Sequence, residues 1–219
     1  MRRPISGQPL ADRRNIGVAL LAAGSSRRFG EADKLAVELD GLMLGQQAAF
    51  AFPLEHVRRA WVIVPALGHP CEPGWRAMGF DPVVNEAAQE GMGTSVALAA
   101  RLAQREGLDA LVVMLADMPL VPPLHHAALI AAVSAPDDIA TSARNGVLMP
   151  PAVFGCAHFE TLAQLSGDKG ARDLLAKGRV IECPDDCLID IDTPEALERI
   201  DATHGQRAND TLKTGPRGD

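Results

Sequence analysis

The segment from Leu21 to Lys34, LAAGSSRRFGEADK, brings glycine, hydroxyl and cationic side chains together in one short stretch. It follows an apolar run, Asn15 to Leu21, that is typical of a buried strand. Ligands of open α/β sheets bind at the carboxyl ends of strands, where glycines such as Gly24 let backbone N–H groups approach phosphate oxygens. With positive charge from Arg28 and Lys34, the segment indicates a triphosphate site. A tight connection without a ligand is the alternative.

A single carboxylate, Asp117, stands at the end of a second apolar run, within Ala110 to Pro123. Removing a carboxylate from water is costly unless hydrogen bonds or a cation compensate. Strand ends in α/β proteins are also where metals and ligands gather, so Asp117 is a candidate metal ligand. Because several prolines follow it, a role in a turn is equally compatible with the pattern.

A second glycine-rich loop begins at Asn85 and leads into an alanine- and leucine-rich stretch with high helix propensity. Gly91 and Gly93 stand just before Thr94, which we expect to be the N-cap of this helix. A glycine hinge before an ordinary core helix accounts for most of the same pattern.

Two later segments carry charged residues of interest. The segment from Ser166 to Leu175, SGDKGARDLL, is typical of a surface helix with solvated charges. The segment CLIDIDTPEALERI predicts a strand followed by a helix that begins at Thr193 and Pro194. Asp190 and Asp192 alternate along that strand, so only one of them faces a given side of the sheet. An acidic residue at a helix start is the alternative reading.

These residues must be positioned by elements that alternate between strand-like and helix-like patterns, which indicates a parallel sheet covered by helices. The predicted fold class is α/β, with three α/β/α layers, a mostly parallel Rossmann-like sheet and a small β-hairpin insertion in the second half. We expect strands at 15–21, 60–66, 81–84 and 110–116, helices at 42–52, 72–78 and 123–133, and a hairpin turn at Asn145 and Gly146. His125 and His126 are expected at the surface.

Composition places limits on the class of protein. The chain has 219 residues, 47% of them hydrophobic, and a formal net charge of -7, which argues against a general nucleic-acid surface. No apolar run is long enough to span a membrane, and the amino terminus lacks the apolar core of a signal peptide, so we expect a cytoplasmic protein. The four cysteines lack C-x-x-C spacing, which favours reduced thiols over zinc or disulfides. We expect a flexible arm at 1–14, one domain at 15–201 and a flexible tail at 202–219.

The first loop resembles the pattern L-A-A-G-x-S-x-R-[FM]-G followed by Lys, the signature of nucleotidyltransferases related to the molybdenum cofactor cytidylyltransferase. The resemblance spans about Ile16 to Ile200. It implies that Arg28, Lys34 and Asp117 are catalytic. It also implies a set of nucleotide-binding residues from both glycine-rich loops and the strand end, namely Leu21, Ala22, Ala23, Gly24, Ser25, Ser26, Arg28, Lys34, Asn85, Gly91, Gly93, Thr94, Ser95 and Asp117.

The same resemblance implies metal and acceptor sites. The D-M-P triplet makes Asp117 a ligand of Mg²⁺, and D-I-D-T-P-E makes Asp192 the second ligand, with Asp190 in reserve. G-D-x-G-A-R places Lys169 and Arg172 toward the acceptor phosphate. Relatives carry G-H-P where this chain has LMPPAVF, and Pro151 is the equivalent proline.

The implied reaction is nucleotidyl transfer, in which an acceptor phosphate attacks the α-phosphorus of a nucleoside triphosphate and pyrophosphate leaves. Ala23 favours CTP, because guanylyl-transferring relatives usually show L-A-G-G. The leading hypothesis is transfer of CMP to molybdopterin, forming the cytosine dinucleotide cofactor for a recipient molybdoenzyme or its chaperone. Alternatives are a GTP-dependent enzyme, a transferase acting on sugar or polyol phosphates, and a non-catalytic protein that delivers the cofactor.

Overall fold

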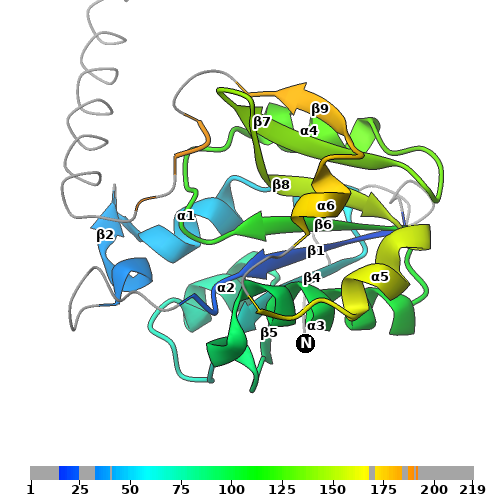
Figure 1. Ribbon diagram of the computed structural model, residues 1–219. Helices are drawn as coiled ribbons and strands as arrows, with labels where there is room; N and C mark the ends of the chain where they lie inside the picture. Colours follow the sequence, from blue (N-terminus) through cyan, green and yellow to red (C-terminus); the bar gives the residue numbers. More distant parts are fainter. Residues whose placement is uncertain are drawn as a thin grey trace, which may run out of the picture.

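A seven-stranded sheet in the order β5-β4-β1-β6-β8-β7-β9 forms the centre of the molecule (Figure 1). The computed structural model describes residues 15–24, 33–39, 41–167, 171–183, 187–189 and 191. Among them, β8 runs antiparallel to both of its neighbours, and the other paired strands of the sheet are parallel. The strands are β1 (Ile16–Leu21), β4 (Arg59–Val64), β5 (Asp81–Val84), β6 (Ala110–Leu115), β7 (Ile139–Arg144), β8 (Val147–Gly155) and β9 (Arg179–Glu182).

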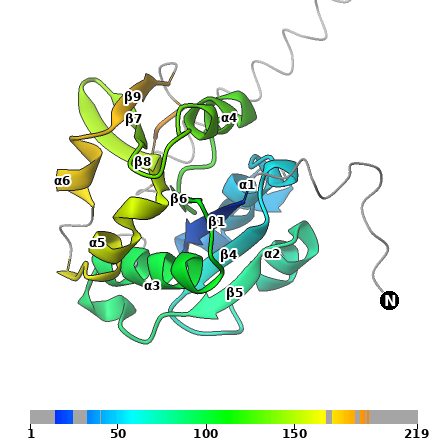
Figure 2. The same ribbon diagram turned by 90° about the vertical axis from the view of Figure 1, so that its right-hand side faces the viewer.

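Helices cover both faces of this sheet (Figure 2). One face carries α1 (Leu44–Phe50), α2 (Glu72–Met78) and α4 (Pro123–Ala131). The other carries α3 (Met92–Arg105), α5 (Phe159–Ala163) and α6 (Arg172–Leu175). A separate two-stranded ribbon pairs β2 (Glu38–Leu39) with β3 (Leu42–Met43) just before α1. The predicted three-layer α/β/α architecture is therefore confirmed.

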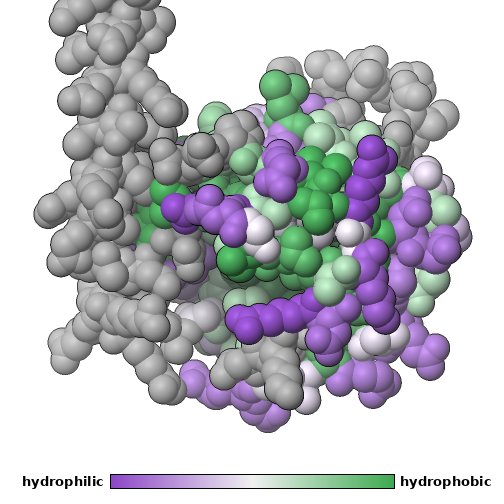
Figure 3. Space-filling model, turned by 45° about the horizontal axis from the view of Figure 1, so that its top comes forward, coloured by the Kyte–Doolittle hydropathy of each residue, from purple (hydrophilic) through white to green (hydrophobic). Residues whose placement is uncertain are grey.

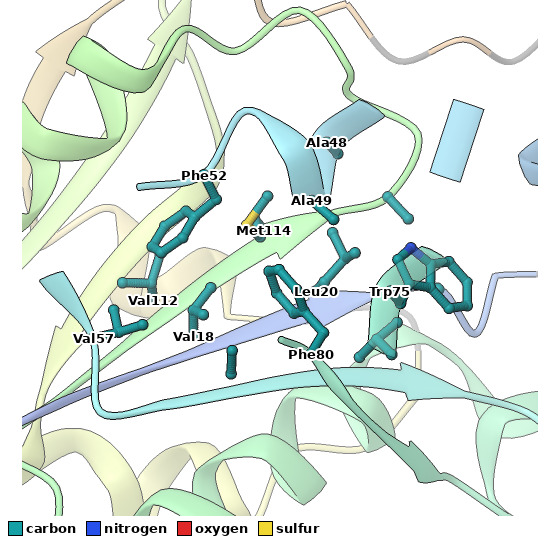
Figure 4. Packing of buried hydrophobic residues seen from close by; sticks show 14 of the residues in the cluster. Val18, Leu20, Ala48, Ala49, Phe52, Val57, Trp75, Phe80, Val112 and Met114 are labelled. Carbon is teal, nitrogen blue, oxygen red and sulfur yellow. The ribbon is translucent and has the colours of Figure 1, made fainter. Parts of the chain in front are cut away.

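The apolar run of β1 is explained by burial on both of its faces. Val18 and Leu20 pack in the hydrophobic cluster under α1, α2 and α4, which Figure 4 shows from close by. Ala19 and Leu21 belong to the cluster under α3, α5 and α6. A strand that is covered by helices on both faces has no solvent-facing positions, so polar residues do not alternate with apolar ones and its sequence is continuously apolar.

The order of the strands creates a switch point between β1 and β6. The chain moves from β1 outward to β4 and β5, then returns to place β6 on the other side of β1. The carboxyl ends of β1 and β6 remain paired at the end of their hydrogen-bond ladder, because the N–H of Ala116 donates to the carbonyl of Leu21 at 3.0 Å. The connections after β1 and β6 therefore start side by side and diverge, which is where ligands bind in open α/β sheets.

The β-hairpin predicted in the second half of the chain is present as β7 and β8. Its turn is at Asn145 and Gly146, both with positive φ, as the Asn-Gly pair predicts. However, β8 pairs with β6 along the register Val113 to Ala152, so the hairpin continues the main sheet. The second half of β8 is buried under helices on both faces of the sheet.

Several local predictions differ from the structure. Helix α1 begins at Leu44, later than predicted, because the two preceding residues pair with β2. The strand predicted from Cys187 is wrong at its start, since Cys187 and Leu188 form a turn. His125 and His126 are both buried, which corrects their predicted surface position. The predicted arm at 1–14, the tail at 202–219 and the last helix lie outside the described residues.

The surface that faces up in Figure 1 mixes hydrophilic and hydrophobic residues, as Figure 3 shows in purple and green. Exposed large hydrophobic side chains include Leu124 of α4, Val147 of β8 and Val180 of β9. Within the described part of the chain, no helix is long and apolar enough to cross a membrane.

Candidate active site

An ion pair joins the two halves of the sheet directly beyond the switch point. The Nζ of Lys34 lies 2.7 Å from Oδ2 of Asp117, and the two side chains are only 11% and 22% exposed. Lys34 comes from the segment after β1 and Asp117 from the segment after β6. The structure therefore brings together the cation and the carboxylate that the sequence placed at two different strand ends.

The second oxygen of Asp117 is the more informative atom. Its Oδ1 is buried and has no hydrogen-bond partner among the described residues. An ionised carboxylate normally accepts at both oxygens, and a buried acceptor without a partner is costly. Carboxylate oxygens are the ligands that Mg²⁺ and similar hard cations prefer. The chemistry of this atom therefore fits a divalent cation.

The first glycine loop starts as an extension of β1 and then becomes open. Ala22 is buried and its N–H donates to the carbonyl of Ile63 at 2.9 Å. Ala23 is half-buried, and Gly24 is exposed with no atom of the described residues within 4 Å of the place a Cβ would occupy. The backbone at Gly24 is thus accessible to a ligand. The predicted residues Ser25, Ser26 and Arg28 lie outside the described residues.

The second loop is held together by its own side chains. Asn85 continues β5, and its Nδ2 donates to the hydroxyl oxygens of Thr94 and Ser95, each at 2.9 Å. The three residues are buried. The structure therefore brings together three predicted nucleotide-binding residues, with their polar atoms bonded to one another. Their contact with a base or ribose stays a prediction.

Thr94 is not the N-cap that the sequence predicted. Helix α3 begins at Met92, with Gly91 in the capping position at a φ of 116°. Thr94 lies in the first turn, and its hydroxyl donates toward the carbonyls of Gly91 and Ala87 at 2.8 and 3.0 Å. Glycine starts the helix here because few other residues adopt that backbone conformation.

Two of the predicted acceptor residues, Arg172 and Pro151, belong to the described residues. The backbone of Ser166 and Gly167 packs directly on Gly93, and Arg172 follows at the start of α6 with an exposed side chain. Lys169 is outside the described residues. Pro151 is buried in β8, where its carbonyl accepts a 2.7 Å hydrogen bond from Ser142. Contact of these residues with an acceptor stays a prediction.

The segment that carries the second predicted metal ligand runs beside Asp117. The N–H of Ile191 donates to the main-chain carbonyl of Asp117 at 3.0 Å, and Ile191 is buried. Asp190 and Asp192, the neighbours of Ile191, lie outside the described residues. Within the part of the chain that the structure describes, no three His, Cys, Asp or Glu side chains cluster as a metal site.

The family follows from these features together with a comparison of the whole sequence. The model of the MobA-like NTP transferase domain matches residues 18–182. The chain belongs to this family. Its fold, its glycine loops and the pair of Lys34 and Asp117 all fall inside the matched range. This MobA-like transferase is therefore a nucleotidyltransferase.

Individual relatives carry different names, and two of the following three are named as nucleotidyl-transferring proteins. The chain is 36% identical over 203 residues to the purine catabolism protein PucB of Bacillus subtilis, covering 84% of this chain and 95% of that protein. It is 35% identical over 147 residues to a phosphoenolpyruvate guanylyltransferase of Rubrobacter xylanophilus, covering 57% of this chain and 69% of that protein. A nucleotidyl transferase structure from Methanothermobacter has a TM-score of 0.74 at 19% identity, covering 88% of this chain and 98% of that one.

Two residues beside Lys34 were not predicted from the sequence. Asp33 accepts a hydrogen bond from the N–H of Leu35, and His69 lies 2.7 Å from the other oxygen of Asp33. An Asp directly before a short helical turn is a recognisable cap signal. His69 gives no comparable local signal, because its partner is distant in the sequence.

Proposed function

We propose that this nucleotidyltransferase transfers CMP from CTP to the phosphate of molybdopterin, forming molybdopterin cytosine dinucleotide and pyrophosphate. The observation that carries the transfer chemistry is the pair of Lys34 and Asp117 at the switch point, with one oxygen of Asp117 buried and unpartnered among the described residues. A carboxylate beside a polyanionic ligand is repulsive unless cations lie between them, so Asp117 supports a site in which Lys34 and a metal ion both take part.

The metal in this proposal is Mg²⁺. Asp117 would hold it through Oδ1, and Asp192 would supply a second carboxylate, since the preceding residue Ile191 is bonded to the main chain of Asp117. When bound, such a cation polarises phosphate oxygens and offsets the charge that builds up on the leaving group.

The residues of the chain act through position and charge. Lys34 and Arg28 bind the triphosphate and neutralise the departing pyrophosphate. An oxygen of the acceptor phosphate forms the new bond to the α-phosphorus, and the bond from that phosphorus to the oxygen bridging to the β-phosphate breaks. The acceptor phosphate is already anionic near neutral pH, so the protein needs no nucleophile of its own.

The choice of CTP rests on Ala23. It lies between buried Ala22 and exposed Gly24 at the end of β1, and it carries a methyl group where a glycine would leave more room. This supports a pyrimidine over the larger purine. GTP is the second candidate, because the Rubrobacter relative is named as a guanylyltransferase.

The choice of molybdopterin rests on the resemblance to molybdenum cofactor cytidylyltransferases, and the acceptor side of the site supports an acceptor that carries a phosphate. Arg172 is exposed, and the segment before it packs against the second glycine loop, which supports recognition of an anionic phosphate there. The name of the Bacillus relative refers to purine catabolism and specifies no acceptor.

The test is pyrophosphate release with molybdopterin and Mg²⁺, comparing CTP with GTP. We expect release with CTP, and release with GTP alone would contradict the nucleotide assignment. Tight CTP binding by calorimetry without release would favour a delivery protein instead. Ala23→Gly should shift preference toward GTP. Ala157→Gly is the matched control, because Ala157 is exposed at the opposite edge of the sheet, where β8 ends.

A further inference from the structure

The short 3₁₀ turn Lys34–Ala36 is attached to the rest of the protein on both sides of Lys34. On the N-terminal side of Lys34, Oδ1 of Asp33 accepts a 3.0 Å hydrogen bond from the N–H of Leu35 and caps the turn. On the C-terminal side of Lys34, Leu35 buries its side chain in the core. The carbonyl of Leu35 accepts a 3.1 Å hydrogen bond from the thiol of Cys71. The main chain that carries Lys34 is therefore fixed at both neighbouring residues.

Both attachments lead to the same segment, the start of α2. Oδ2 of Asp33 lies 2.7 Å from Nε2 of His69, and Nδ1 of His69 accepts from the N–H of Cys71 at 3.0 Å. A neutral imidazole has one N–H, and here Nδ1 is already the acceptor. The proton is consequently on Nε2, where it is donated to Asp33 without any need for a charged ring.

The ring of His69 is itself held firmly. It stacks on the indole of Trp75, with ring centroids 4.9 Å apart and an angle of 28° between the planes. Trp75 is fully buried, and its Nε1 donates to the carbonyl of Gly45 at 2.7 Å. The His69 side chain is only 10% exposed, so the donor that faces Asp33 has little freedom to move.

The Cys71 thiol keeps its proton and remains a donor. Burial, with a further contribution from the negative charge of Asp33, raises the pKa of this thiol to about 12. The hydrogen bond from Cys71 to Leu35 is therefore maintained at neutral pH.

We infer that Asp33 and His69 are positioning residues for Lys34 in nucleotidyl transfer. The inference rests on the nucleotidyltransferase reaction above, and it is independent of which nucleotide or acceptor is used. Lysine ends in a point charge on a long flexible chain, so its aim depends on where its main chain is held. Small misplacements of such a charge are expensive, because a displacement of about 1 Å can cost on the order of 100-fold in rate.

Two substitutions of His69 separate positioning from local folding. Asn has an oxygen where Nδ1 stands and can still accept from the N–H of Cys71, but it is too short to reach Asp33. Gln reaches Asp33 with its N–H₂ group and preserves the bond across to the turn. We expect His69→Asn to lower kcat for pyrophosphate release at least tenfold with KM for the nucleotide changed less than threefold, and His69→Gln to stay within about threefold of the native rate.

Asp33 offers the reciprocal experiment. Asp33→Asn keeps the oxygen that caps Leu35, but it turns an N–H₂ group toward the N–H of His69, so the two donors oppose each other. We expect a loss of kcat like that of His69→Asn. Combining Asp33→Asn with His69→Gln should restore activity, because the Gln amide can rotate and accept from Asn. Equal rates for the Asn and Gln variants of His69, or no recovery in the double variant, would overturn the inference.

A second measurement does not depend on turnover. Long-range ¹H–¹⁵N NMR of the imidazoles reports which ring nitrogen is protonated. We expect the Nε2–H tautomer for His69 in the native protein and its loss in Asp33→Asn, whereas an Nδ1–H tautomer in the native protein would overturn the pairing. Absence of pyrophosphate release by the native protein would count against the proposed function and leave this result interpretable.

Discussion

The main chain of Gly167 lies so close to Gly93 that a Cβ on Gly93 would stand 2.7 Å from the carbonyl oxygen of Gly167. That distance is too short for a carbon and an oxygen that are not bonded. The contact joins the start of α3, in the second glycine loop, to the segment that leads toward Arg172. Glycine at position 93 is thus explained by close packing of two loops.

Gly93→Ala should therefore separate these two loops. We expect a loss of about 1–3 kcal/mol in the free energy of unfolding, the usual cost of forcing extra volume into a packed site. Denaturant unfolding measures this change. If the acceptor site is where we propose, KM for the acceptor should rise more than KM for the nucleotide.

Gly24→Ala is the matched control in the first loop. No atom of the described residues lies within 4 Å of a Cβ at Gly24, so the free energy of unfolding should stay within about 0.5 kcal/mol of native. The nucleotide should nevertheless bind more weakly in calorimetry, because the added methyl group obstructs the backbone that faces the phosphates. Unchanged binding would argue against a phosphate contact at this glycine.

Asp117→Asn tests the metal site. The amide keeps the shape of the side chain but lacks the charge that pairs with Lys34 and that would hold a divalent cation. We expect Mg²⁺-dependent pyrophosphate release to fall by about 100- to 1,000-fold, the range seen when one electrostatic group is removed from a transition-state site. Circular dichroism should show an intact fold.

Asp109→Asn provides the comparison at the opposite end of β6. Asp109 is exposed and directly precedes β6, whereas Asp117 and the switch point lie beyond the carboxyl end of that strand. Its substitution should leave release unchanged. Equal effects of the two variants, or unchanged turnover in Asp117→Asn, would reject the metal role.

The elements that were predictable from the sequence are those whose pattern is set by burial. β1 and β6 are buried on both faces, so their apolar runs marked them as strands and placed Lys34 and Asp117 at one edge of the sheet. The turn of the hairpin was predictable because Asn145 and Gly146 tolerate a positive φ.

The missed features depend on partners that are distant in the sequence. His125 and His126 were expected at the surface as adjacent polar residues on a helix. They are buried because two sides of α4 pack against other elements. His125 forms a hydrogen bond with Ser142 of β7, and the ring of His126 contacts Phe52, which follows α1. The contact of His69 with Asp33 likewise could not be predicted from the sequence, because it forms only when the segment before α2 packs beside the residues that precede Lys34.

Cys71 predicts a loss of stability in alkaline solution. Its pKa is raised from 9.0 to about 12 in the folded protein, chiefly by burial. Between these values the unfolded chain releases the thiol proton and the folded protein keeps it. The contribution of this proton to the free energy of unfolding is therefore fully present below pH 9 and is lost as the pH rises toward 12. Urea unfolding from pH 8 to 11 measures the slope.

The comparison for this slope is Cys71→Ser. The serine hydroxyl can still donate to Leu35 but does not ionise in this range, so its stability should fall less steeply with pH. Parallel slopes for the two proteins would show that Cys71 does not retain its proton on folding.

His126 predicts the opposite pH dependence. Both ring nitrogens are buried without hydrogen-bond partners among the described residues, and burial is the main cause that lowers the pKa from 6.5 to about 3. Below pH 6.5 the unfolded chain binds a proton that the folded protein does not, so this residue costs stability as the pH falls toward 3.

His126→Phe should remove that cost. The ring of His126 meets Phe52 edge-on at 5.0 Å, a contact that another phenyl ring can make. Because two unpaired buried nitrogens also disappear, we expect a gain of about 1 kcal/mol at pH 7 and a larger gain at pH 5. Thermal unfolding at both pH values measures the difference. A gain that is the same at pH 5 and pH 7 would mean that His126 is protonated equally in the folded and unfolded protein, because only a proton bound by one state alone makes stability depend on pH.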